Sequence, residues 1–137
     1  MFFKKKENKS ENNFLIKICA LLIHAAKIDE NYTNSEEKII RETLLKLGSN
    51  ENELDKTIKE AKIIEENSNQ ILDFTREVKN LTEEDKIKII EALWSIIYSN
   101  EDADIYETNL MRRLAGLLYI DSKTMGDIKN RIQNQKP

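Results

Sequence analysis

Residues 91–111, EALWSIIYSNEDADIYETNLM, decide the fold of this chain, because an earlier stretch repeats their pattern. That stretch, residues 20–40, is ALLIHAAKIDENYTNSEEKII. Each begins with an apolar segment of helical spacing, continues into an acidic turn that contains asparagine, and ends in a second helix. When the two stretches are aligned, Leu22 corresponds to Leu93, Glu36 to Glu107, Ile40 to Met111 and Arg41 to Arg112. The pattern predicts a duplicated helix–acidic turn–helix unit.

The composition agrees with a helical protein. The chain has 137 residues, which is enough for one domain with its own core, and only 3 glycines and 1 proline, which is the last residue. No segment shows the alternating pattern of a half-buried strand. We therefore predict an all-α fold, a compact bundle of about seven helices. Residues 14–137 would form one domain, after a polar, disordered tail at residues 1–13.

Apolar spacing and capping residues predict where the helices begin and end. Gly48 is expected to end the second helix, Ser49 to cap the third, Thr82 with Asp85 to begin the fifth, and Asp121 or Ser122 to cap the seventh. The fifth helix has the broadest apolar stripe and is expected to be central, with Trp94 and Tyr98 in the core. On the third helix, Ile64 or its neighbour Ile63 is expected to be buried. The expected helices are Glu11–Lys27, Asn34–Leu47, Asn50–Glu66, Asn69–Asn80, Glu83–Ser99, Ile105–Tyr119 and Ser122–Gln133.

Charge and hydropathy exclude several classes of protein. The net charge of −3 argues against a nucleic-acid binder, which would present a basic face. The longest nearly apolar stretch, residues 14–28, contains Lys17, His24 and Lys27, so we expect no membrane span. Cys19 is the single cysteine and lies in an apolar run, so we expect a buried thiol and a cytoplasmic protein.

The two acidic turns hold the candidate metal site. Clustered carboxylates suit a hard cation such as Ca²⁺ or Mg²⁺, although neither turn matches the EF-hand loop. A structural alternative stays open, because Thr33 with Glu36, and Asp104 with Glu107, have the spacing of helix N-terminal caps. No cofactor is certain. The candidate metal ligands are Asp29, Glu36, Asp102, Asp104 and Glu107.

The same turns are the candidate docking surface for another protein. Their exposed carboxylates and neighbouring aromatic rings would contact a partner through Tyr32, Tyr106, Glu30 and Glu101. The sequence has no Ser/His/Asp order, no glycine-rich phosphate loop and no CxxC motif, and His24 is its single histidine. We therefore expect no catalytic residues and a protein that is not an enzyme. Its oligomeric state and partner are not encoded in any motif.

The stretch from Leu93 to Leu118 resembles the second-repeat signature of the TerB-like (tellurite resistance protein B) family. The earlier stretch HAAKIDENYTNSEEKII resembles the first repeat, with Asp29 and Glu36 at the motif positions. Glutamates stand where the family has glycine after the aspartate, and Asn100 replaces the second aspartate. A side chain at a position of positive φ costs about 1 kcal/mol, so these turns are expected to differ in shape. The matching residues of the second repeat are Tyr106, Glu107, Leu110, Arg112 and Arg113.

The resemblance, which covers about residues 14–133, implies a fold and a context. It implies seven helices from duplicated units, a role in resistance to tellurite and other stresses, and kinship with the N-terminal domain of DjlA-type co-chaperones. It also implies that acidic residues bind metal ions. Our main hypothesis is a non-enzymatic protein-interaction module in a stress response, and the alternative is a divalent-cation-binding module that uses the acidic turns.

Overall fold

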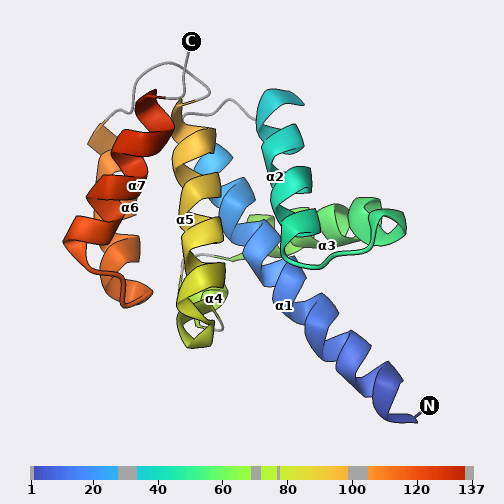
Figure 1. The fold of residues 1–137 in the computed structure, drawn as a ribbon. Coiled ribbons are helices and arrows are strands. Elements are labelled where there is room, and N and C mark those ends of the chain that lie inside the picture. Colours follow the sequence, from blue (N-terminus) through green and yellow to red (C-terminus); the bar gives the residue numbers. More distant parts are fainter. Residues whose placement is uncertain (1, 28–33, 69–71, 77, 99–104, 135–137) are drawn as a thin grey trace.

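Every regular element in the part of the chain that the structure describes is helical (Figure 1). This computed structural model describes residues 2–27, 34–68, 72–76, 78–98 and 105–134, with the side chains of residues 2–13, 72 and 105–107 left out. The all-α prediction is therefore confirmed. The elements are α1 (Phe2–Lys27), α2 (Asn34–Lys46), η1 (Glu51–Glu53), α3 (Leu54–Asn67), α4 (Leu72–Thr75), η2 (Val78–Asn80), α5 (Glu83–Tyr98), α6 (Ile105–Leu117) and α7 (Ser122–Asn134).

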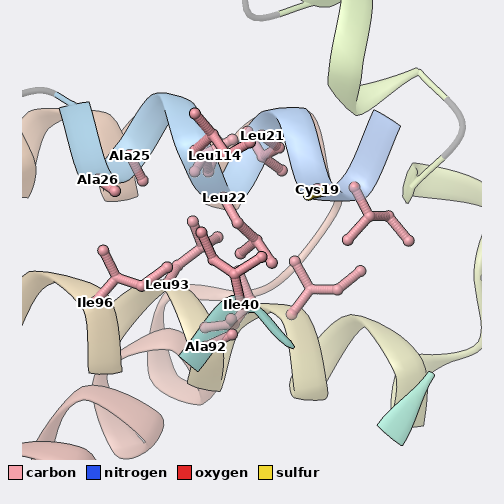
Figure 2. Packing of buried hydrophobic residues seen from close by; sticks show 14 of the residues in the cluster. Cys19, Leu21, Leu22, Ala25, Ala26, Ile40, Ala92, Leu93, Ile96 and Leu114 are labelled. Atoms are coloured by element: carbon pink, nitrogen blue, oxygen red, sulfur yellow. The ribbon is translucent and has the colours of Figure 1, made fainter. Parts of the chain in front are cut away.

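Two helices, α1 and α5, form the centre of the bundle. The helix α1 packs against α2, α3, α4 and α5, and α5 packs against α1, α2 and α7. Between Leu15 and Ala26 every α1 residue except Lys17 and His24 is buried, so this part of α1 is enclosed on nearly all sides. The sequence predicts one central helix, α5, whereas the structure has two. Figure 2 shows how the side chains of Leu22, Ile40 and Leu93 gather between α1 and α5.

The N-terminal segment differs from the prediction. The helix α1 begins at Phe2 rather than near Glu11, and its N-terminal end projects away from the other helices (Figure 1). Residues 2–13 contain no glycine or proline, so nothing in the sequence interrupts a helix that grows outward from the buried part of α1. The predicted start at Glu11 is wrong, and the division of the chain into tail and domain stays a prediction.

The third and fourth predicted helices are each divided. The third consists of η1 followed by α3, and its cap is Asn50 rather than Ser49, because the Asn52 N–H donates to Asn50 Oδ1 at 3.0 Å. The predicted helix Asn69–Asn80 is wrong, since the structure has the two short elements α4 and η2 there. A segment this short has little helical stability of its own, so its path follows the burial of Phe74 and Val78.

Three further predicted helix ends are confirmed by hydrogen bonds, whereas the predicted caps Thr33 and Asp104 lie outside the described residues. Gly48 has a φ of 104° and ends α2, where the Ser49 N–H donates to the Leu44 carbonyl at 2.9 Å. The N–H of Asp85 donates to Thr82 Oγ1 at 3.2 Å at the start of α5. Asp121 Oδ1 accepts from the Thr124 N–H at 2.7 Å at the start of α7, and this bond lowers the pKa of the Asp121 carboxyl.

The described helices lack the combination of length and apolarity that crossing a bilayer requires. This agrees with the expectation of no membrane span for that part of the chain. The longest helix, α1, begins in residues that include Lys4, Lys5 and Lys6, and its apolar half is enclosed by other helices.

Candidate functional site

One of the predicted site residues, Glu36, has its side chain in the described part of the chain. It lies in the first turn of α2 and is only 1% exposed, so this carboxylate faces the core rather than the surface. The backbone of Tyr106 and Glu107 lies in α6, while their side chains are outside the description. The other predicted site residues lie outside the described residues: Asp29, Glu30, Tyr32, Glu101, Asp102 and Asp104.

The helix ends next to the acidic turns are at the same end of the bundle. In Figure 1, the C-terminal ends of α1 and α5 and the N-terminal ends of α2 and α6 are all at the upper end of the bundle. Helix N-termini favour nearby carboxylates through their partial positive charge. Among the described residues, no three histidine, cysteine, aspartate or glutamate side chains are grouped closely enough to hold a metal ion.

A second cluster of charges, at Glu65, joins α3 to the end of α1. Glu65 Oε1 accepts a hydrogen bond from Lys27 Nζ at 2.7 Å, and its Oε2 lies 3.1 Å from His24 Nδ1. The Glu65 side chain is only 10% exposed. His24 also lies against Phe74, with ring centroids 6.4 Å apart. The cluster fixes the last turn of α1, which leads directly into the first acidic turn.

The electrostatics of this cluster favour the charged form of Glu65. Burial alone raises the pKa of a carboxyl, because it removes water from the anion. Here the hydrogen bonds and charges of Lys27 and His24 outweigh burial, so the pKa of Glu65 lies below its ordinary value of 4.5. Glu65 is therefore a carboxylate at neutral pH and holds its two basic partners in place.

The position of Glu65 explains why α3 is rotated as it is. The buried residues Leu54, Ile58 and Ala61 follow a spacing of four and three, and the next position of that stripe is 65. The adjacent isoleucines therefore turn outward, and Ile63 is 52% and Ile64 37% exposed. The prediction that one of these isoleucines is buried is wrong, because a paired glutamate takes the place of an apolar residue at the end of the stripe.

Ion pairs also join α2 to α3. Arg41 pairs with Asp55, and Lys62 Nζ lies 3.5 Å from Glu37 Oε1. Both pairs have exposed partners, so each contributes little to stability. They nonetheless place charged side chains of α3 opposite side chains of the other sign on α2, just as Glu65 of α3 lies opposite Lys27 of α1.

The side chains predicted to belong to the core are found there. Cys19 is completely buried, and burial raises the pKa of its thiol to about 12, which makes it unreactive at neutral pH. Trp94 and Tyr98 stack with ring centroids 5.9 Å apart, and Lys129 Nζ lies 5.5 Å from the centre of the Trp94 ring. The Trp94 indole N–H has no hydrogen-bond partner among the residues that the structure describes.

Two surface hollows are defined by described residues. One, of about 280 Å³, lies between α2, α5 and α7 and is lined by side chains of both charges, among them Glu42, Lys46, Lys88 and Glu91. The other, of about 410 Å³, lies between α1, α3 and α4 and includes Ile63, Ile64 and Arg76. Sequence reasoning missed the Glu65 cluster and this second hollow, although a glutamate in the apolar stripe of α3 was a signal for both.

Comparison with known proteins gives one match. The family model described as TerB, tellurite resistance protein TerB, matches residues 15–130. No curated protein and no solved structure matches the chain. The matched range includes both acidic turns, the Glu65 cluster and the second hollow.

Proposed function

We propose, from the premise that this chain belongs to the TerB family of tellurite resistance proteins, that it is a non-enzymatic protein-interaction module. It would act in a cytoplasmic stress response of the tellurite-resistance kind. The surface that binds the partner would be the end of the bundle where the two acidic turns leave the helices.

The observation that supports this proposal most is the common position of four helix ends. The ends of α1 and α5, and the beginnings of α2 and α6, share one end of the bundle (Figure 1). If the two turns leave the same end of the bundle on one side, their carboxylates would form one acidic face. Such a face attracts a basic partner, and charge complementarity speeds and orients the encounter.

The residues expected to contact the partner are the acidic and aromatic residues of the turns. Glu30 and Glu101 would meet basic side chains, and Tyr32 and Tyr106 would supply apolar contact area. The Glu65 cluster would support such a surface, because it fixes the last turn of α1 through Lys27.

The test compares two charge reversals of equal size. Immobilised wild-type protein is used to capture partners from a lysate, beside Glu30→Lys/Glu101→Lys and a control, Glu42→Lys/Glu51→Lys, whose exposed glutamates lie on α2 and η1. We expect one or more proteins, identified by mass spectrometry, to be captured by the wild type and the control and lost with the acidic-turn variant. Capture that both variants retain, or no specific capture by the wild type, would contradict the proposal.

The alternative function, divalent-cation binding, uses the same turns. It is favoured by the two sets of carboxylates and by Glu36, whose burial beside the first turn would lower the exposure of a bound ion to water. Its ligands would be Asp29 and Glu36 in the first unit and Asp102, Asp104 and Glu107 in the second. The replacement of a motif aspartate by Asn100 weakens this alternative, because it removes one negative charge.

A thermal melt separates the two functions. An ion that binds only the folded state at 100 times its Kd stabilises it by about 2.7 kcal/mol, a shift of several degrees. If cation binding is the function, Ca²⁺, Mg²⁺, Mn²⁺ or Zn²⁺ will raise the melting temperature, and Asp29→Asn/Asp104→Asn will abolish that rise. The control Glu42→Gln/Glu51→Gln must keep it. No rise with any cation at millimolar concentration excludes this alternative.

A further inference from the structure

The first residues of α1 carry a charge opposite to that of the rest of the chain. Residues 2–13 read FFKKKENKSENN, with four lysines and two glutamates, so their net charge is +2, whereas the net charge of the other residues is −5. Three of the four lysines are consecutive, and they directly follow two phenylalanines. Residues 2–6 thus join a pair of aromatic residues to a cluster of cations.

The helix α1 holds residues 2–6 away from the acidic bundle. It is continuous from Phe2 to Lys27, and its first part projects beyond the other helices (Figure 1). Among the described side chains of α1, burial begins at Leu15, nine positions after Lys6, which is ~13 Å along the axis of an α-helix. Charges are screened over about 8 Å at physiological ionic strength. The negative charge of the bundle therefore does little to weaken the attraction of an anion to the lysine cluster.

The register of residues 2–6 makes them the end of a helix rather than a stripe along it. Successive residues of an α-helix are rotated by about 100°, so five consecutive residues extend around the whole circumference. A helix that lies flat on a membrane needs an apolar stripe, and residues 2–13 contain no apolar residue besides Phe2 and Phe3. Contact with a binding partner is therefore expected through the end of α1.

The two residue types together indicate the chemistry of that partner. The surface of an anionic bilayer attracts clustered lysines within about one Debye length, and the layer beneath its headgroups accepts aromatic rings. A nucleic-acid duplex offers phosphates to the lysines, but it offers no apolar layer to the two phenylalanines. A membrane surface therefore suits both parts of residues 2–6.

We propose that α1 binds end-on, and reversibly, to the surface of a bilayer that contains anionic phospholipid. Phe2 and Phe3 would enter the boundary between headgroups and acyl chains, and Lys4, Lys5 and Lys6 would pair with headgroup phosphates. This inference does not rest on the proposed interaction module. It is compatible with that module, because the first acidic turn follows the opposite end of α1 and would lie away from the membrane.

The test uses vesicles of defined composition. The full chain is sedimented with vesicles of phosphatidylcholine that contain about 30% phosphatidylglycerol, and with vesicles of phosphatidylcholine alone. We expect binding to the anionic vesicles to be at least about tenfold tighter, and added salt to weaken it. Equal binding to the two kinds of vesicle, or no binding to anionic vesicles at millimolar lipid, would overturn the proposal.

Matched lysine variants locate the electrostatic part of the binding. A lysine next to an anionic surface strengthens binding about fivefold, so Lys4→Gln/Lys5→Gln/Lys6→Gln should weaken binding to the anionic vesicles by at least about tenfold. A control with the same change of charge should weaken it by less than about threefold. An equal loss in both variants would refute a site at the start of α1. The control replaces exposed lysines of α2, α3 and α7, in Lys46→Gln/Lys59→Gln/Lys123→Gln.

A second pair of variants tests the apolar part. Phe2→Ser/Phe3→Ser should weaken binding to the anionic vesicles by about tenfold, because the rings would no longer enter the bilayer. The control Ile63→Ser/Ile64→Ser also replaces two adjacent apolar residues, both exposed, and should change binding by less than about twofold. Melting temperatures check that all variants fold. No loss with the phenylalanine variant would contradict entry into the bilayer.

A nucleic-acid duplex and a second copy of the chain are the competing partners of residues 2–6. A fluorescein-labelled duplex that binds more tightly than the anionic vesicles at the same salt concentration, and is lost with the lysine variant, would assign the cluster to nucleic acid and overturn the proposal. Sedimentation of the chain alone tests self-association. A dimer that Phe2→Ser/Phe3→Ser dissociates would overturn the proposal as well, whereas a monomer leaves the end of α1 free for the membrane, as the proposal requires.

Discussion

At Glu65, a carboxylate of α3 meets two basic side chains of α1 that lie 41 and 38 positions earlier in the sequence. Its carboxylate contacts Lys27 at 2.7 Å and His24 at 3.1 Å, while 10% of its side chain is exposed. Ion pairs as enclosed as this one are sensitive to the loss of either partner, because the remaining charge stays poorly solvated. The consequences reach beyond stability, since the same pair determines which side of α3 faces the solvent.

Replacing Glu65 by glutamine should destabilise the protein near neutral pH by about 1–2 kcal/mol, because charge-assisted hydrogen bonds become neutral ones. The control is Glu66→Gln, whose side chain is exposed. It should change the free energy of unfolding by less than about 0.5 kcal/mol. Urea denaturation measures both. Equal effects of the two variants would contradict the described pairing of Glu65.

The effect of Glu65→Gln should also depend on pH. The folded-state pKa of Glu65 lies below 4.5, so its ionisation stabilises the fold above the unfolded value and ceases to do so as the pH falls through the folded value. The wild type and Glu65→Gln both carry His24→Asn in this series, so that Lys27 is the basic partner that remains at Glu65. The difference in unfolding free energy should stay constant down to about pH 5 and narrow below 4.5. If the difference between the two proteins grew as the pH fell, the pKa of Glu65 would be raised in the folded state rather than lowered.

Cys19 should be unreactive in the folded protein. Burial raises the pKa of its thiol to about 12, so the thiolate is essentially absent at mildly alkaline pH, and the side chain is 0% exposed. A thiol reagent such as DTNB should give no colour with native protein and one equivalent of colour in guanidinium. Rapid reaction in the native state would show that α1 opens locally.

At the scale of elements, helix ends are built from a few residues close in sequence. The ends of α2 and α6 have the same pair of hydrogen bonds, with Ile120 N–H donating to the Ala115 carbonyl at 2.9 Å in α6. In α2 the residue of positive φ is Gly48, whereas in α6 it is Tyr119, with a φ of 57°. A tyrosine there is less favourable than glycine, and its ring lies 5.9 Å from Lys86 Nζ.

Replacing Gly48 by alanine should destabilise the protein by about 1 kcal/mol, because a φ of 104° is unfavourable for any residue with a Cβ. The matched control is Gly126→Ala within α7, where an added Cβ meets no atom within 4 Å. That change should stabilise by about 0.5–1 kcal/mol. Thermal melts should therefore shift in opposite directions. A shift in the same direction for both would contradict the assigned backbone of Gly48.

At the scale of the whole molecule, α1 and α5 meet at the centre of one continuous core (Figure 2). The residues that the repeat pairs have matching burial there. Leu22 and Leu93 are both 0% exposed, and Ile40 and Met111 are 0% and 1% exposed. These pairs agree with a duplicated unit, and the duplication itself stays a prediction.

Truncating either central leucine should be costly. Leu22→Ala and Leu93→Ala should each destabilise by about 2–5 kcal/mol, because each leaves a cavity between closely packed helices. The control Ile63→Ala, at an exposed isoleucine of the same chain, should cost less than about 1 kcal/mol. Denaturant unfolding at one temperature compares the three. A small effect at only one leucine would show that the two helices do not contribute equally to the core.

The sequence by itself determined the helical class, most helix ends and the burial of Cys19 and Trp94, because these depend on spacing and capping over a few neighbouring residues. Only the tertiary structure decided that α1 is as central as α5, that residues 69–80 do not form one helix, and that Ile63 and Ile64 face outward. These features depend on contacts between residues far apart along the chain, such as Glu65 with His24. Local periodicity cannot specify such pairs, because the partner that stabilises a glutamate in an apolar stripe lies on a different helix.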